Sequence, residues 1–339
     1  MNKKRRLFSG KIWIILLAMI VLAAFYKLPY YVSAPGSAEV ISDYVEVEDG
    51  NNSDGEFMFT TVRMGRANIY SYLWAKVADY HKIYRLNEVR SEEETDEEYA
   101  VRQLKMMDES QITAILNAYK KAGYEAKIRT NGIYILHVGK GTPAEGSLKA
   151  GDRILEIDGK TIASQQFFVD YVSGKEAGDE VKVKVEREDE TMEKTLTLER
   201  LKETGKIGMG ISLVEDRSVE ADPEVKFNTE TIGGPSAGLM FSLEIYNQLT
   251  DEDYTDGKKI AGTGTISEDG KVGPIGGIDQ KIVAADEEGA EIFFAPNEEG
   301  AEDSDYQTAL KTAKDIDSDM VIVPVDTFDD AITYLEQLK

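Results

Sequence analysis

The stretch Gly234-Pro235-Ser236-Ala237-Gly238 places a serine between glycines, directly before an apolar segment. Apolar residues then recur at helical spacing, which predicts a buried helix from Ser236 to Leu249; they are Leu239, Leu243, Tyr246 and Leu249. A serine at a glycine-framed turn before a helix is a typical setting for an exposed nucleophile. The structural alternative is that Ser236 serves only as the N-cap of that helix.

A nucleophilic serine needs a base, and the sequence restricts which base is available. The chain has two histidines, His81 and His137, and both precede Ser236. This excludes the order of α/β-hydrolases, in which the histidine follows the serine. We expect His137, in the middle of a strand, and His81, on an aromatic helix, to be structural residues.

A lysine is the remaining candidate base, and Lys281 stands at the start of a helix expected from Ile278 to Glu288. A helix N-terminus disfavours a cation, and burial lowers the pKa of a lysine, so Lys281 could be neutral near pH 7. Unpaired amides at the turn before a helix can stabilise an oxyanion. The turn residues expected to shape that oxyanion site are Gly234, Pro235 and Ala237.

Further motifs follow the serine in order, and residues 205–339 resemble the proteolytic domain of the Lon (S16) peptidase family. The motifs are Gly234–Gly238, Thr263-Gly264-Thr265-Ile266, Gly270-Lys271-Val272 and the segment from Pro274 to Lys281. The resemblance implies an α+β fold, Ser236 as nucleophile and Lys281 as general base. It also implies a supporting hydrogen bond from Thr263, although a plain strand role for this residue stays open. Gly233 departs from the acidic residue that many ATP-dependent members carry three positions before the serine.

Residues 126–201 resemble a PDZ domain of the bacterial type, rich in β-strands with short helices. The resemblance is carried by Gly141-Thr142-Pro143-Ala144, by Leu148–Leu155 and by Asp158-Gly159. It implies that a ligand peptide adds as a strand beside Ile133 to Val138, near a helix at Gln165 to Val172. The expected peptide-binding residues are Gly132, Ile133, Tyr134 and Ile135. The alternative is a PDZ domain that only packs on its neighbour and gates access.

The N-terminus combines a basic start with an apolar run, Ile12 to Tyr26. Without a clear cleavage site after the run, we expect an uncleaved transmembrane helix over residues 11–31. The basic residues put the tail, residues 1–10, in the cytoplasm, and all that follows the helix outside the cell. In the lead region, residues 32–125, we expect the strand Phe57–Val62 to join the catalytic sheet, so that the PDZ domain is an insertion.

A helix is also expected from Ala67 to Leu86. Its aromatic residues, Tyr70, Tyr72 and Trp74, are more typical of core packing, and they are also compatible with a position near a membrane.

Composition excludes several classes of function. The chain has 339 residues and a net charge of −24, which argues against nucleic acid as a partner. It has no cysteine, so thiolate catalysis and cysteine-ligated metal are excluded, and two distant histidines make a zinc site improbable. There is no glycine-rich phosphate loop ending in Lys-Ser/Thr, so we expect no nucleotide and no other cofactor.

The full arrangement resembles the YlbL/SepM-like membrane-bound proteases of Gram-positive bacteria. We therefore expect an ATP-independent, membrane-anchored serine endopeptidase that cuts flexible peptides or membrane-proximal protein segments outside the cytoplasm. The PDZ domain would recruit or gate the substrate. Two alternatives stay open: a peptide-binding membrane scaffold with an inactive protease domain, and an esterase or amidase that uses the same two residues.

Overall fold

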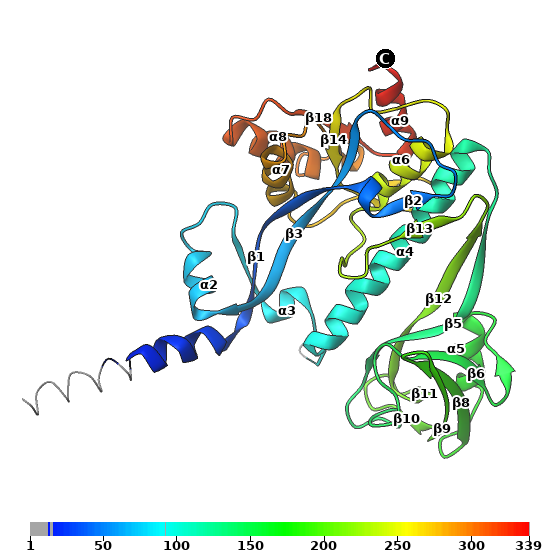
Figure 1. The fold of residues 1–339 in the computed structure, drawn as a ribbon. Coiled ribbons are helices and arrows are strands. Elements are labelled where there is room, and N and C mark those ends of the chain that lie inside the picture. Colours follow the sequence, from blue (N-terminus) through cyan, green and yellow to red (C-terminus); the bar gives the residue numbers. More distant parts are fainter. Residues whose placement is uncertain (1–12, 14–15, 92, 339) are drawn as a thin grey trace, which may run out of the picture.

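A six-stranded sheet forms the centre of the larger of two bodies (Figure 1). The computed structural model describes residues 13, 16–91 and 93–338. The strand order is β18 (Val321–Val325), β17 (Ile292–Pro296), β14 (Lys259–Gly262), β3 (Glu56–Asn68), β1 (Lys27–Val40) and β4 (Lys82–Arg85). Neighbours are parallel from β18 to β3, whereas β1 runs antiparallel to both β3 and β4.

Strand β3 joins the lead region to the catalytic segment. Phe57 is paired with Ile260 and Phe59 with Gly262, so the prediction that Phe57–Val62 joins the catalytic sheet is confirmed. Alternate side chains of a strand point to opposite faces. Accordingly Phe57 and Phe59 enter one hydrophobic core and Met58 enters another, on the opposite face.

Helices cover both faces of this sheet. The core on the Phe57 side contains residues of α4 (Asp96–Ala122), α6 (Gly238–Leu249) and α9 (Phe328–Glu336). The core on the Met58 side contains residues of α7 (Ile278–Glu287) and α8 (Asp305–Asp315). Helix α4 is a single long helix because Thr95 and Glu98 form a capping box at its start and Gly123, with φ 82°, ends it.

The second body is built on a sheet in the order β12-β5-β6-β8-β9, with its own hydrophobic core (Figure 1). The strands are β5 (Ala126–Val138), β6 (Arg153–Ile157), β8 (Glu180–Arg187), β9 (Glu190–Thr197) and β12 (Ile211–Ala221), with β7 (Lys160–Thr161) beside β6. Helix α5 (Gln165–Ser173) packs on it, and β10 (Glu199–Arg200) pairs with β11 (Ile207–Gly208).

The long pair β5 and β12 connects the two bodies. At one end Ile133 belongs to the core of the second body and Leu213 packs against it, and at the other end Ala126 and Ala221 pack against the core of the first. The second body is therefore inserted between α4 and β13 (Val225–Phe227). Residues from 205 onward were expected to belong to the catalytic segment, but β12 lies in the second sheet because it pairs with β5 along its whole length.

Small elements complete the first body. Strand β13 pairs with β2 (Val45–Val47), and β15 (Thr265–Ile266) pairs with β16 (Val272–Gly273). Two 3-10 helices, η1 (Ile41–Asp43) and η2 (Glu298–Gly300), lie in connections. The helix expected over 67–86 is much shorter: α2 (Ile69–Trp74) is followed by a turn, by β4 and by α3 (Leu86–Val89).

The N-terminal segment departs in part from the expected span over 11–31. Residues 16–25 are helical, but residues 27–31 belong to β1, where they pair with β3 and β4, so a helix cannot continue to residue 31. The expected basic tail, 1–10, and residues 11, 12, 14 and 15 lie outside the described residues. Among the helices formed by the residues that are described, none combines the length and the apolarity needed to cross a bilayer.

Candidate active site

Lys281 is buried in the first body, with 2% of its surface exposed. It lies in the first turns of α7, which begins after Gly277, a residue with φ 75° that glycine adopts without strain. Its Nζ lies 2.8 Å from Ser236 Oγ, 3.0 Å from Thr263 Oγ1 and 2.8 Å from the carbonyl oxygen of Thr60. The structure thus brings the three residues expected to form the site into direct contact.

Burial determines the protonation of this lysine. Loss of hydration lowers the pKa of Lys281 to about 7, and Asp305 opposes this shift weakly. The Thr60 carbonyl can only accept a hydrogen bond, and the Thr263 hydroxyl donates its own proton to the Ser236 carbonyl at 3.0 Å. Both oxygens therefore accept from Lys281. A neutral amine has two N–H groups and one lone pair, so its lone pair is left to accept the Ser236 hydroxyl proton.

Hydrogen bonds with α4 hold the loop that carries Ser236. The Gly234 amide donates to the Gln103 carbonyl at 2.8 Å, and Ser110 Oγ donates to the Pro235 carbonyl at 3.0 Å. Gly234 has φ 94°, in the region that favours glycine. A Cβ at Gly233 would approach Gln103 Cβ to 2.8 Å, so any larger side chain would collide with α4 here. This is a physical reason for glycine at the position that is acidic in many ATP-dependent Lon-type proteases.

Helix α6 begins later than expected. It starts at Gly238 with Ala237 as its N-cap, so Ser236 precedes the helix and does not cap it. The Ser236 carbonyl accepts from the Gly264 amide at 2.8 Å. The amides of Ser236 and Ala237 donate to no backbone oxygen of the described chain, which leaves them available to an oxyanion.

A cleft of about 960 Å³ opens at Ser236 and Lys281. One wall is β3, from Phe59 to Met64, and the opposite wall includes the loop Thr231–Ala237 and the segment Pro274–Gly276. Strand β14 pairs with β3 only as far as Phe59. Beyond it, this edge of β3 has no strand partner among the described residues, so its backbone can pair with an extended peptide.

Polar contacts behind the cleft hold α7 and its preceding loop. Gln280 Nε2 donates to Ser33 Oγ at 2.9 Å, and Lys82 pairs with Asp279 at 2.8 Å. The Ile275 amide donates to the Asp305 carboxylate at 2.8 Å. Sequence reasoning gave no role to the contacts of these residues, or to those of Thr60 and Gln103, because nothing in their local sequence signals their distant partners.

The two histidines lie away from this site. His137 Nδ1 contacts Glu98 at 2.8 Å, and His81 Nδ1 contacts the carbonyl of Asp79 at 2.8 Å. These are structural contacts, as expected.

The expected peptide-binding strand of the second body has no free edge. Ile133 is paired with Glu215 on one side and Ile154 on the other, and Tyr134 is likewise paired with Val214 and Arg153. Ile135 is paired with Leu213 and bonded to Asp152. A Cβ at Gly132 would lie 2.4 Å from the Ile154 carbonyl oxygen. A ligand strand could bind Gly132–Ile135 only by displacing β12.

Strand β12 is one of the two open edges of this sheet, and β9 is the other. Strand β12 pairs with β5 alone among the strands of the described chain, and α5 begins beside it, since the Gln165 amide donates to the Glu215 carboxylate at 2.8 Å. The segment Gly208-Met209-Gly210 leads into β12, and Gly210 has φ 78°. No role was predicted for this segment from the sequence, so its position before an open edge was missed.

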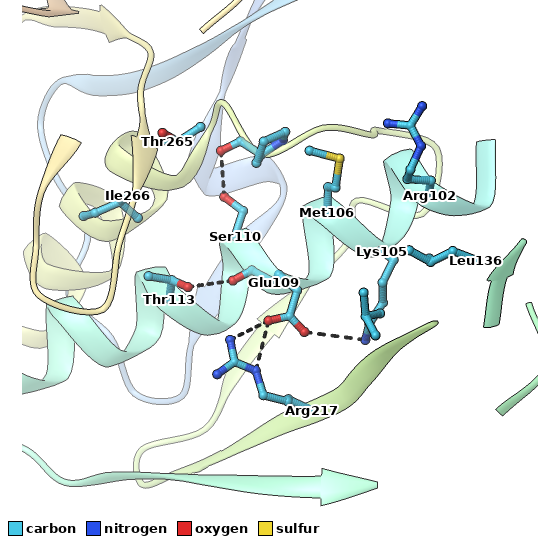
Figure 2. A pocket seen from close by; sticks show the side chains of 12 residues that line it. Arg102, Lys105, Met106, Glu109, Ser110, Thr113, Leu136, Arg217, Thr265 and Ile266 are labelled. Carbon is cyan, nitrogen blue, oxygen red and sulfur yellow. Dashed lines mark hydrogen bonds and ion pairs between the residues drawn. The ribbon is translucent and has the colours of Figure 1, made fainter. Parts of the chain in front are cut away.

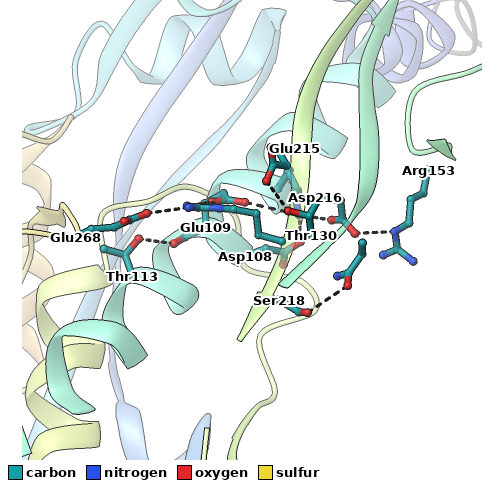
Figure 3. A network of polar contacts seen from close by, with 12 residues as sticks. Asp108, Glu109, Thr113, Thr130, Arg153, Glu215, Asp216, Ser218 and Glu268 are labelled. Carbon is teal, nitrogen blue, oxygen red and sulfur yellow. Dashed lines mark hydrogen bonds and ion pairs between the residues drawn. The ribbon is translucent and has the colours of Figure 1, made fainter. Parts of the chain in front are cut away.

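A polar network joins the second body to α4 (Figure 3). Lys105 of α4 pairs with Asp216 of β12 at 2.5 Å, and Asp216 also pairs with Arg153 of β6 at 2.6 Å. Glu109 of α4 pairs with Arg217 at 2.5 Å. Because α4 also holds the Ser236 loop, one helix connects that loop with the second body.

A smaller pocket of about 300 Å³ lies between these parts (Figure 2). Figure 2 shows Met106 and Ser110 of α4 beside the pocket. Leu136 lies on one side of it, and Thr265 and Ile266 lie on the opposite side. Pro235 and Thr265 line both this pocket and the cleft. Val214 of the open strand β12 also lines it, so the cleft and the β12 edge are neighbours.

Two family models match the chain. Residues 103–198 match the model of the PDZ domain, and residues 228–336 match that of the Lon protease (S16) C-terminal proteolytic domain. The first match begins inside α4, whereas the sequence had placed the start of the PDZ domain at residue 126.

Among curated proteins, the Lon protease of Metamycoplasma arthritidis is 31% identical over 106 residues, which are 31% of this chain and 12% of that protein. The mitochondrial Lon protease homolog of Caenorhabditis elegans is 37% identical over 83 residues, 24% of this chain and 8% of that protein. The chain thus matches about a tenth of the length of these relatives.

Among solved structures, the PDZ domain of the SdrC-like protein from Listeria monocytogenes is 38% identical to the matching part of this chain. The match has a TM-score of 0.25 and covers 26% of this chain and 93% of the Listeria domain. The two family models show that the chain carries a PDZ domain and a Lon-type (S16) C-terminal proteolytic domain.

Proposed function

We propose that this protein is an ATP-independent serine endopeptidase in which Ser236 is the nucleophile and Lys281 the general base. The observation that carries this proposal is the contact of a buried lysine, with a pKa of about 7, with the Ser236 hydroxyl at 2.8 Å. Thr263 is a positioning residue, because it binds both Lys281 and the Ser236 carbonyl.

The chemistry follows from these contacts. Ser236 Oγ attacks the carbonyl carbon of a peptide bond while Lys281 Nζ takes its proton. The amides of Ser236 and Ala237 stabilise the oxyanion. The Lys281 ammonium then gives its proton to the leaving amine, which produces an acyl-enzyme and a free amino terminus. Neutral Lys281 next takes a proton from water, whose oxygen attacks the ester, and Ser236 is regenerated.

The substrate that fits is an extended peptide segment. In the cleft its backbone would pair with the open edge of β3, beyond Phe59, and its side chains would meet Val62, Met64 and Ile232. A folded domain would have to unfold locally to adopt this conformation. We infer that the enzyme cuts flexible segments and chain ends.

The PDZ domain would present such segments. Its open strand β12 can receive a peptide by strand addition, and Val214 on that strand lines the pocket next to the cleft. We therefore place the recruiting edge on Ile211–Val214 in place of Gly132–Ile135. The apolar run Ile12–Tyr26 with its basic flank would anchor the chain, with the catalytic body outside the cytoplasm, as in the YlbL/SepM-like proteases it resembles.

The test is hydrolysis of unstructured, internally quenched peptides by the full chain in detergent. The rate should rise with pH through about 7, because Lys281 must lose its proton before it can act. The Ser236→Ala variant should be inactive. A rate that stays flat from pH 5 to 9 would contradict a lysine base, whereas absence of hydrolysis together with peptide binding would favour the membrane scaffold.

A further inference from the structure

The short helix α2 presents an apolar surface to solvent. Tyr70 is 43% exposed, Leu73 57% and Trp74 63%, and Val77 in the following turn is 76% exposed. These four residues, here called the α2 patch, line a shallow hollow with Ser71. Clustered exposed apolar side chains typically mark a surface that binds a partner or a membrane.

Helix α2, which carries the α2 patch, lies beside the N-terminal helix (Figure 1). Tyr70 Oη donates to the Ile20 carbonyl at 2.7 Å, which joins α2 to the helical residues 16–25. That helix also exposes its apolar side chains, among them Leu17, Leu22 and Phe25. The two apolar surfaces are therefore neighbours.

The charge of this part of the chain differs from the rest. Residues 61–90 contain six basic and two acidic residues, a net charge of +4, whereas the whole chain carries −24. Ion pairs with Asp96 and Asp279 offset some of these basic residues. Lys76, next to the patch, has its Nζ 4.8 Å from the centre of the Tyr72 ring and forms no ion pair with a carboxylate of the described chain. An excess of basic residues beside exposed Trp and Tyr is suited to anionic lipid headgroups.

The depth at which the α2 patch would lie in a bilayer also fits the interfacial region. Ile20 precedes Phe25 by five residues, which is about 7.5 Å along a helix. Amphipathic elements that lie in a bilayer surface are buried by about 5–10 Å. If residues 16–25 enter a bilayer, the contact at Ile20 holds α2 within that zone.

We propose that the α2 patch docks into the interfacial region of a bilayer that contains anionic lipid. The N-terminal helix and the α2 patch would then give two attachments, and β1, which leads from this helix into the central sheet, would hold the cleft in a fixed orientation above the lipid. This inference goes beyond the proposed peptidase activity, and it uses the proposed membrane entry of the N-terminal segment.

Tryptophan fluorescence tests the proposal on the full chain. The sequence has two tryptophans, Trp13 and Trp74, so the Trp13→Phe variant leaves Trp74 as the only one. This variant is reconstituted into vesicles of phosphatidylcholine and phosphatidylglycerol. Lipids brominated near the headgroup end of their chains should quench Trp74 by about half, and aqueous iodide should quench it little, as interfacial burial requires.

Vesicle-bound protein whose Trp74 is quenched by iodide and not by brominated lipid would overturn the proposal. The same holds if Trp74 becomes protected from iodide without vesicles as protein concentration rises, since a second copy of the chain would then cover the patch.

Matched variants locate the effect. In the Trp13→Phe background, Leu73→Glu with Val77→Glu should remove the quenching by brominated lipid, whereas Val321→Glu, at a β18 residue that is 51% exposed, should leave it unchanged. Peptide hydrolysis in detergent should be the same in all these variants. This second readout separates failure of lipid docking from failure of the proposed peptidase.

Discussion

Two regions of this protein each bury a lysine, but only one of them places carboxylates next to it. Lys105, 4% exposed, lies between α4 and β12 against Asp216, with Asp108 and Glu109 within 4 Å. Lys281, 2% exposed, lies in the cleft among a carbonyl and two hydroxyls. In the described chain no carboxylate lies within ion-pair distance of Lys281. The two buried lysines therefore differ in their neighbours, and a carboxylate in contact with a lysine favours the ammonium form whereas burial beside neutral oxygens does not.

Of the substitutions that test this comparison, those of Lys281 should have the largest effect, and the effect should be on catalysis. Lys281→Met and Lys281→Arg should each lower kcat/KM for an unstructured peptide by about 10³-fold or more, since neither side chain can accept the Ser236 proton at neutral pH. The control is Lys120→Met, at an exposed lysine of α4 outside the cleft, which should leave kcat/KM unchanged. Substantial hydrolysis by both Lys281 variants would show that another group is the base.

On stability, Lys105→Met should have the next largest effect. It leaves the buried Asp216 with its charge less compensated, which typically costs about 3–5 kcal/mol. Urea unfolding followed by circular dichroism measures this loss, with Lys120→Met, at an exposed position of the same helix, as the control. An equal effect of the two substitutions would mean that the Lys105 ion pair does not contribute.

Lys281→Met should instead raise the free energy of unfolding at pH 7, because methionine has no charge that folding must remove from water. The folded state lowers the pKa of Lys281 to about 7, below its usual value, so it binds fewer protons than the unfolded state between these two values. The free energy of unfolding of the wild-type protein therefore increases as the pH rises from 7 toward 10.5. Below pH 7 the cost of burying Lys281 lowers this free energy in full. Urea unfolding at pH 7 and pH 10 should show the advantage of the variant shrinking; an advantage that grows with pH would contradict a neutral buried lysine.

The smallest expected effect is at the positioning residue. Thr263→Val removes hydrogen bonds to Lys281 and to the Ser236 carbonyl, so we expect kcat to fall by about tenfold and the pH midpoint of activity to move. Thr263→Ser retains the hydroxyl and should restore both. A fall in kcat with an unchanged pH midpoint, not rescued by serine, would indicate that Thr263 serves only in packing.

Much of the candidate site could be expected from the sequence because its residues stand in local motifs. Ser236 at a glycine turn and Lys281 after Gly277 have signals within a few residues of themselves, and Phe57–Val62 has the composition of a buried strand. The identity and approximate placement of these residues therefore follow from short-range chemistry.

The sequence was a poor guide wherever the partner of a segment lies far along the chain. The peptide-binding edge was expected on β5 because the resemblance to a PDZ domain implied it, yet β12, about eighty residues later, occupies that side of β5. Similarly, nothing around Thr60 or Gln103 indicates that their carbonyls hold Lys281 and Gly234. Backbone groups bond in a way that is independent of side-chain identity, so strand neighbours and carbonyl contacts leave no local sequence signal.

By itself the sequence determined the chemical groups of this protein: a serine, a lysine and a threonine in ordered motifs, a strongly acidic chain, and a basic, apolar N-terminus. Only the tertiary structure decided what those groups can do. It placed Lys105 against a carboxylate and Lys281 away from one, and it gave the open edges to β3 and β12. The physical reason is that hydration, charge pairing and strand pairing depend on which atoms meet after folding, and those atoms come from segments far apart in the chain.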